Sequence, residues 1–149
     1  MGRRGAVGWP GRITERLRFE RAARSAYPGL RGGPLKHTGS KGFRYMVSVP
    51  VPFYETRTVT IIFPPGERTP VVLVDGPPDS PHRYDDSGLC MWHPKDPPSM
   101  RWRFENGLLD LLDAICAHLF REAWWREHHE WLGPEVGHMP DTTDTKEAA

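Results

Sequence analysis

The sequence predicts an α+β fold, with an N-terminal helix, an antiparallel meander of about four strands, a long active-site loop and C-terminal helices packed on one sheet face. Three observations predict this order. Apolar residues recur at helical spacing near the N-terminus and again after Asn106, strand-like segments lie between these regions, and short proline-rich turns separate the strands. The 149 residues correspond to about one domain with its own core.

The first predicted helix covers residues 12–26. Its apolar residues can share one stripe at helical spacing: Ile13, Leu17, Phe19 and Ala23. The helix should end near Tyr27, because Pro28 disfavours helical geometry in the residue before it. Residues 1–11 are rich in glycine and are predicted to be flexible, and residues 28–42 are predicted to form a loop.

Three segments have the character of strands. Residues 43–51 alternate apolar and polar side chains, residues 57–63 are rich in β-branched side chains, and residues 69–74 read TPVVLV. A fourth, short strand is expected before Phe43. The connections are short, which favours an antiparallel meander.

Residues 75–103 follow no regular pattern and contain six prolines, which predicts an extended loop laid on the core. The strongest helical pattern in the chain begins after Asn106, the predicted N-cap, and runs through residues 107–131. Cys116 lies beside its apolar stripe and is interpreted as a packing thiol. Residues 139–149 are polar and are predicted to be a disordered tail.

Charge is distributed unevenly although the net charge is only +1. Residues 1–36 carry nine basic and two acidic side chains, a net +7, which leaves −6 for the remainder. A basic leading segment indicates a docking surface for an acidic partner, while the plainer interpretation is a solvated helix face with a loose tail. No nucleic-acid motif accompanies the arginines, so nucleic acid is not an expected partner.

The expected location is the reducing cytoplasm. No apolar run is long enough to cross a membrane, the N-terminus has no secretory apolar region, and two cysteines are too few for a disulfide framework.

One stretch concentrates residues with chemical reactivity: HRYDDSGLCMWHP, from His82 to Pro94. An acidic turn with glycine should bring Cys90 to the surface. Asp85 and Asp86 would raise the pKa of its thiol, while His82 and His93 could offset that effect. The local sequence by itself favours a structural cysteine.

Two other interpretations of this stretch stay open. Zinc could use Cys90 with His82 and His93, but a closed site needs four ligands and a second close pair is missing, so no metal or other cofactor is expected. Cys–His hydrolase chemistry would pair His82 or His93 with the thiol and use Asp85, Asp86 or Asp96 as the orienting group.

The order of parts resembles the ubiquitin-conjugating enzyme (UBC) family, and more closely its divergent bacterial branch. Three blocks carry the resemblance: His-x5-Gly-x-Cys-x-Trp-x-Pro-x-Asp-Pro from His82 to Pro97, Trp102 followed by Gly-Leu-Leu and His-Leu-Phe-Arg-Glu-Ala-Trp-Trp, and Glu-Trp-Leu-Gly-Pro-Glu before His138. The resemblance covers about residues 12–138, which would form one UBC-like domain.

The resemblance implies an enzyme of antiphage defence, of the kind found in type II cyclic-oligonucleotide-based systems (CBASS). Cys90 matches the cysteine that accepts a ubiquitin-like or protein C-terminus as a thioester and passes it to an amine. The expected partners are an activating enzyme, docked by Arg16, Arg18 and Arg21, and a ubiquitin-like modifier or a target protein such as a nucleotidyltransferase. An incoming thioester is already activated, so Cys90 needs no strongly lowered pKa.

The chain departs from the family at one functional position. Eukaryotic members have His-Pro-Asn ahead of the cysteine, and the asparagine stabilises the oxyanion, whereas here His82 is followed by Arg83 and Tyr84. The only asparagine is Asn106, and there is no glutamine. His93, His82 or backbone N–H groups would therefore stabilise the oxyanion, and Asp85, Asp86 and Asp96 would orient the incoming amine. The departure also leaves room for a catalytically inactive scaffold of the same fold.

Overall fold

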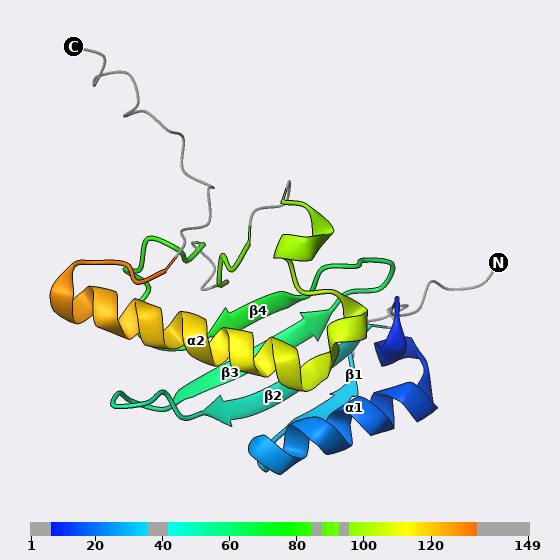
Figure 1. Ribbon diagram of the computed structural model, residues 1–149. Coiled ribbons are helices and arrows are strands. Elements are labelled where there is room, and N and C mark those ends of the chain that lie inside the picture. Colours follow the sequence, from blue (N-terminus) through cyan, green and yellow to red (C-terminus); the bar gives the residue numbers. More distant parts are fainter. Residues whose placement is uncertain (1–6, 36–41, 85–87, 93–95, 134–149) are drawn as a thin grey trace.

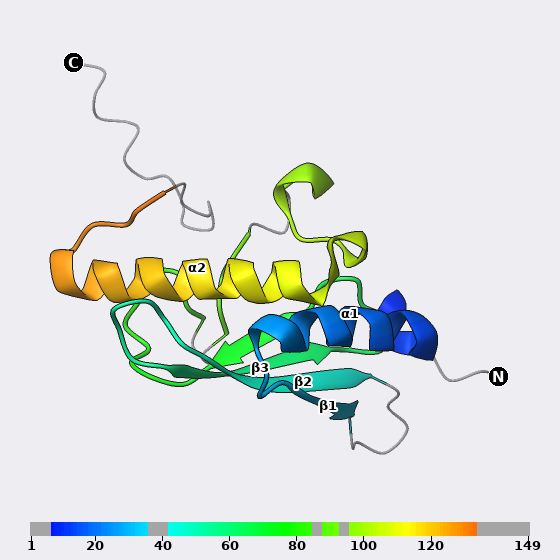
Figure 2. The same ribbon diagram turned by 60° about the horizontal axis from the view of Figure 1, so that its bottom comes forward.

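Two helices cover one face of a four-stranded antiparallel sheet (Figures 1 and 2). The computed structural model describes residues 7–35, 42–84, 88–92 and 96–133. Its elements are η1 (Trp9–Gly11), α1 (Ile13–Ala26), β1 (Arg31–Pro34), β2 (Phe43–Val49), β3 (Arg57–Phe63), β4 (Val71–Val74), η2 (Pro98–Met100), η3 (Phe104–Asn106) and α2 (Gly107–His128). The predicted α+β class is confirmed.

The sheet is a meander in the order β1-β2-β3-β4, with every neighbouring pair antiparallel. The strand expected before Phe43 is β1, which lies inside the segment predicted as a loop. Its residues, RGGP, give no alternating signal. Gly32 is needed there, because a Cβ atom at that position would lie 2.7 Å from the Tyr45 ring.

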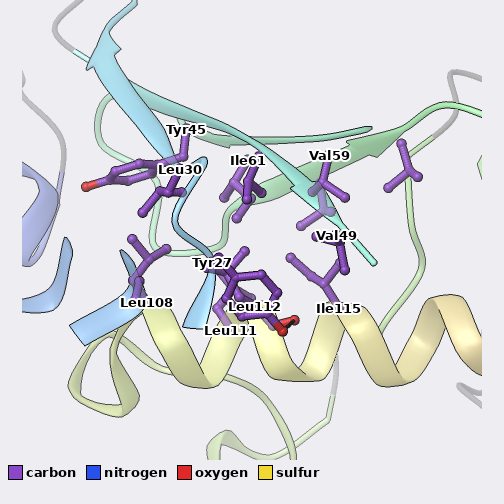
Figure 3. Close-up of a cluster of buried hydrophobic side chains, with 14 of the residues drawn as sticks. Tyr27, Leu30, Tyr45, Val49, Val59, Ile61, Leu108, Leu111, Leu112 and Ile115 are labelled. Atoms are coloured by element: carbon purple, nitrogen blue, oxygen red, sulfur yellow. Dashed lines mark hydrogen bonds between the residues drawn. The ribbon is translucent and has the colours of Figure 1, made fainter. Parts of the chain in front are cut away.

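The core lies between this sheet and α2 (Figure 3). Strand β2 alternates strictly between buried and exposed residues, so that Tyr45 and Val47 face the helices together with Val59 and Ile61 of β3. The helix contributes five buried apolar side chains: Leu108, Leu111, Leu112, Ile115 and Leu119. Burial of each such side chain contributes about 1.5–3 kcal/mol, so this layer is the main source of stability.

The predicted apolar stripe of α1 is right for two of its four residues. Ala23 is buried and Phe19 packs against the core, but Ile13 and Leu17 are 62% and 53% exposed, and Glu20 is buried instead. The buried face of the helix therefore includes charged residues: the Arg16 guanidinium lies 4.4 Å from the centre of the Phe43 ring, and its Nε atom lies 3.9 Å from Glu20 Oε2. The helix does end at Ala26, as Pro28 predicts.

Helix α2 begins where the sequence predicts, but Asn106 has a different role. Its Oδ1 atom accepts a hydrogen bond of 2.8 Å from the backbone N–H of Arg103, within the turn η3, and makes no side-chain cap to α2. The helix ends at His128 because His129 adopts a left-handed conformation, with φ 57°. It is therefore three residues shorter than predicted, and it is the only C-terminal helix in the described part of the chain.

The ordered fold begins before residue 12. Trp9 is 1% exposed, and its indole N–H donates a hydrogen bond of 2.9 Å to the carbonyl of Phe104. Residues 1–6 and the predicted tail at 139–149 lie outside the described residues. No helix in the described part of the chain combines the length and the apolar character needed to cross a membrane.

Candidate active site around Cys90

The loop that carries Cys90 is attached to the outer edge of β4 by backbone hydrogen bonds. The N–H of Leu89 donates to the carbonyl of Val72, and the N–H of Cys90 donates to the carbonyl of His82, each at 2.8 Å. Leu73 pairs with Gly88, and Arg83 pairs with Leu89, as isolated antiparallel bridges. The backbone of the segment predicted to be irregular is thus fixed at the cysteine and at the two residues before it.

Cys90 is only 1% exposed, so the expectation that the acidic turn brings it to the surface is wrong. The pairing with β4 lays Leu89 and Cys90 against the body of the protein, and both are buried. Burial raises the pKa of the Cys90 thiol, and a hydrogen bond with Tyr84 acts in the opposite direction. The thiol therefore favours its protonated form at neutral pH.

His82 is buried beneath the same loop, in contact with other rings. Its ring centre lies 4.2 Å from that of Trp131 and 6.3 Å from that of His118. His118 projects from α2 and is 4% exposed, and burial lowers its pKa to about 4. His118 was not among the predicted site residues, although its spacing of three residues from Ile115 places it on the buried face of α2.

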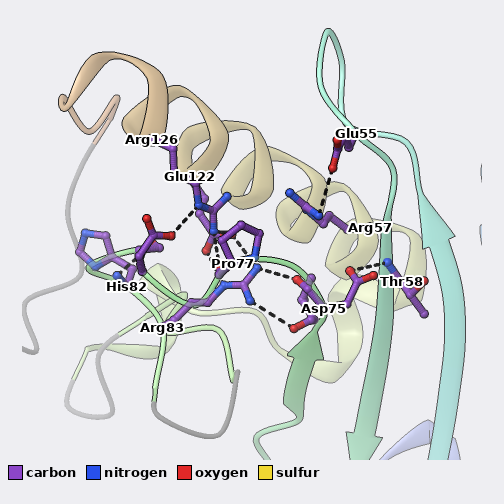
Figure 4. Close-up of polar contacts among 12 residues, drawn as sticks. Glu55, Arg57, Thr58, Asp75, Pro77, His82, Arg83, Glu122 and Arg126 are labelled. Atoms are coloured by element: carbon purple, nitrogen blue, oxygen red, sulfur yellow. Dashed lines mark hydrogen bonds and ion pairs between the residues drawn. The ribbon is translucent and has the colours of Figure 1, made fainter.

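A group of ionised side chains, with Arg83 and Glu122 buried at its centre, lies next to His82 (Figure 4). Arg83 makes a two-pronged contact with Glu122 of α2, with Nε and Nη2 donating to the two carboxylate oxygens at 2.8 and 2.7 Å. Arg126 donates to Glu122 at 2.8 Å and to Asp79 at 2.8 Å. The side chains of Arg83 and Glu122 are 0% and 1% exposed.

This ion cluster fixes the chain between β4 and Cys90. Arg83 also donates to the carbonyls of Val74 and Asp75, and Arg126 donates to the carbonyl of Pro77. Burial alone would raise the pKa of Glu122, but the hydrogen bonds and charges of Arg83 and Arg126 outweigh it and hold that pKa below its usual value. Arg83 therefore has a structural role at the position that follows the loop histidine.

The structure places the other predicted site residues as follows. Asp96 is half-buried, and His93, Asp85 and Asp86 lie outside the described residues. Arg18 and Arg21 are exposed on α1, where a partner can reach them. Arg16 is turned inward, and its Nη1 donates to the carbonyl of Pro10.

A mainly apolar cavity of about 650 Å³ lies beside the Cys90 loop. The loop contributes Tyr84, Leu89 and Met91, so the cavity wall includes both chain neighbours of Cys90. The turn between β3 and β4 contributes Pro70 to the lining, and the cavity has two charged lining residues, Glu67 and Arg101. A cavity of this size accommodates an extended chain of a few residues.

Among the residues that the structure describes, no group of three or more His, Cys, Asp or Glu side chains could hold a metal ion. No protein-family model matches this chain, and no curated protein matches it. The geometry around Cys90 and the order of the elements are therefore the grounds for assigning a function.

The two cysteines should differ in reactivity in the folded protein. Burial raises the pKa of both thiols, but Cys116 is only half-buried and lines a surface groove. We expect iodoacetamide to modify Cys116 at least about tenfold faster than Cys90, because Cys90 reacts only after local opening of the loop. Peptide mapping by mass spectrometry measures both rates, and denaturant should remove the difference. Equal rates in the native protein would contradict the buried position of Cys90.

Proposed function

We propose that this chain is a bacterial ubiquitin-conjugating-like enzyme, with Cys90 as the residue that carries the acyl group. The observation that carries the proposal is the position of Cys90: backbone pairing to β4 holds it beside a mainly apolar cavity of about 650 Å³. The order of helix, four-stranded meander, cysteine loop and second helix supports the same assignment.

The proposed chemistry consists of two acyl transfers without a redox step. The Cys90 thiolate attacks the thioester that joins a ubiquitin-like or protein C-terminus to the activating enzyme. A bond forms between the Cys90 sulfur and the carbonyl carbon, and the bond from that carbon to the activating enzyme's sulfur breaks. The activating enzyme's thiolate leaves and takes up the proton lost by Cys90. An amine then attacks the Cys90 thioester, an amide forms, and the amine's proton returns to the Cys90 sulfur. The oxyanion in each step would be stabilised by His82, His93 or backbone N–H groups, with Asp96 as a group that orients the amine.

Burial of Cys90 adds a requirement to this proposal. Attack on a thioester needs the sulfur to reach the carbonyl carbon, and a side chain that is 1% exposed cannot do so from its present position. The short pairing of residues 88–90 with Val72 and His82 must therefore open when the activating enzyme docks. Exposed Arg18 and Arg21 on α1 provide the docking surface in this proposal. A cytoplasmic location and a role in antiphage defence belong to it as well.

The experiment uses tagged protein incubated with ATP in a lysate of its native host. Intact mass and non-reducing gels should reveal an adduct on the wild type that thiols remove. Cys90→Ser should give an ester that resists thiols or no adduct, while the matched control Cys116→Ser should behave as the wild type. An adduct that survives in Cys90→Ala would show that Cys90 is not the acyl carrier.

The burial and raised pKa of Cys90 favour a second candidate, a non-catalytic interaction scaffold with the same fold. In that case no adduct forms in the lysate, and Cys90→Ala protein still protects cells against phage. Loss of protection in Cys90→Ala, with an unchanged melting temperature, would rule the scaffold out.

A further inference from the structure

Phe53, at the tip of the loop between β2 and β3, has a position that is unfavourable for an isolated chain. Its side chain is 96% exposed, and its backbone is left-handed, with φ 68°. Bulky residues rarely adopt that conformation, and glycine or asparagine would do so at lower cost. A fully exposed phenyl ring also gains nothing from burial. An aromatic side chain at this position gains burial energy only if something outside the chain covers it.

The loop between β2 and β3, which carries Phe53, lies beside the C-terminal half of α2 (Figure 2). The hydroxyl of Tyr54 donates to Glu127 at 2.7 Å, and the Tyr54 ring lies 5.8 Å from that of Phe120. The N–H of Tyr54 also closes a turn with the carbonyl of Val51 at 3.0 Å. A loop backbone that is already held in place loses little conformational freedom when a partner binds it.

A groove of about 580 Å³ lies directly beside Phe53, which forms one of its walls. Its other lining is largely apolar and includes Tyr27, Cys116, Ala117, Phe120 and Leu132. A cavity of about 150 Å³ already holds a benzene molecule, so this groove has room for a phenyl ring from outside. A projecting ring and a receiving groove are thus adjacent on one surface.

The charges around Phe53 are balanced. Phe53 also lines a second groove, together with Tyr54 and Ala123. The two grooves contain equal numbers of acidic and basic side chains: Glu55, Asp113 and Glu127 against Arg57, Arg121 and Arg126. Several already have partners within the chain, such as Glu55 with Arg57 at 3.6 Å and Arg126 with Asp79 at 2.8 Å. A strongly acidic or basic partner would require a surface of opposite net charge, whereas a surface that meets its own copy must avoid net charge.

We propose that two copies of this chain associate across a two-fold axis, with Phe53 of each copy inserted into the groove beside Phe53 of the other. A two-fold contact uses the same surface twice, and the adjacent ring and groove give such a surface both complementary parts. The association does not depend on the chemistry of Cys90, so it stands or falls separately from the proposed function.

Sedimentation equilibrium of the full chain over about a hundredfold range of concentration tests the association. The wild type should move from one chain mass toward two. Phe53→Asn should raise the dimer dissociation constant about thirtyfold or more, since loss of a buried aromatic anchor has an effect of that order. Asparagine tolerates the left-handed backbone, so this variant should melt no lower than the wild type.

A second variant tests the insertion geometry. Ala117 is exposed on α2 and lines the groove, so Ala117→Arg should block it while keeping good helix propensity. Each variant by itself should dimerise much more weakly than the wild type, but an equimolar mixture should dimerise more strongly than either variant alone, because one of the two contacts is intact in the mixed pair. A wild type that remains a single chain at every concentration would overturn the proposal and would indicate that a different protein covers Phe53. An unchanged dimer in Phe53→Asn, or no recovery in the mixture, would also overturn it.

Discussion

Replacing Glu122 with leucine should lower the free energy of unfolding by about 3–5 kcal/mol, the usual result when one partner of a buried ion pair is removed. The change leaves the guanidinium of Arg83 at 0% exposure without the carboxylate that now accepts two of its hydrogen bonds. Arg126 loses its bond to Glu122 as well but keeps Asp79. Urea unfolding at neutral pH measures the effect.

Two further variants separate the desolvation of Arg83 from other causes. The double variant Arg83→Met with Glu122→Leu removes both buried charges, so it should recover most of the stability lost in the single variant. Asp79→Asn is the matched control, because Asp79 is 61% exposed and its pair with Arg126 should contribute less than about 1 kcal/mol. A double variant as unstable as the single one would show that packing at position 122, and not the unpaired charge, causes the loss.

This ion cluster also shows why the sequence predicts the helices and strands better than it predicts the candidate site. The pattern of β2, with its strict alternation, and the apolar spacing of α2 are local signals, and the structure confirms both elements. Strand β1 is different, because its Gly-Gly-Pro residues pair only through the backbone of β2 and give no pattern. Helix α1 misleads because its buried face includes Glu20, which a hydrophobicity pattern excludes.

The residues around Cys90 depend on contacts between distant parts of the chain. Arg83 and Glu122 are 39 positions apart, and Trp131 reaches His82 from beyond the end of α2. The loop appears irregular in the sequence, since only pairing with β4 gives it order. The sequence could have flagged Glu122, which interrupts an apolar stripe and stands four residues before Arg126. The burial of Cys90 has no comparable local signal.

His118 should make the protein lose stability as the pH falls from about 6.5 to about 4. Burial lowers its pKa from 6.5 to about 4, so within this range the unfolded chain binds a proton that the folded chain does not. The free energy of unfolding therefore has its full value above the unfolded pKa. It declines by about 3 kcal/mol as the pH falls to the folded pKa. The groups that face His118 are the rings of His82 and Trp131 and the charges of Glu122, Arg121 and Arg83.

His118→Phe isolates this effect, because it keeps a ring against Trp131 and removes the titrating group. It also removes Nε2, which has no hydrogen-bond partner among the described residues. Near pH 7 the free energy of unfolding of the variant should differ from that of the wild type by less than about 1.5 kcal/mol. Near pH 5 it should gain about 2 kcal/mol relative to the wild type.

Urea unfolding across this pH range measures both differences. The control His128→Phe, at an exposed position, should keep the wild-type dependence on pH. Glu122 affects the curve only below its usual pKa of 4.5, because its folded pKa is lowered. A wild-type slope that persists in His118→Phe would place the proton uptake on another group.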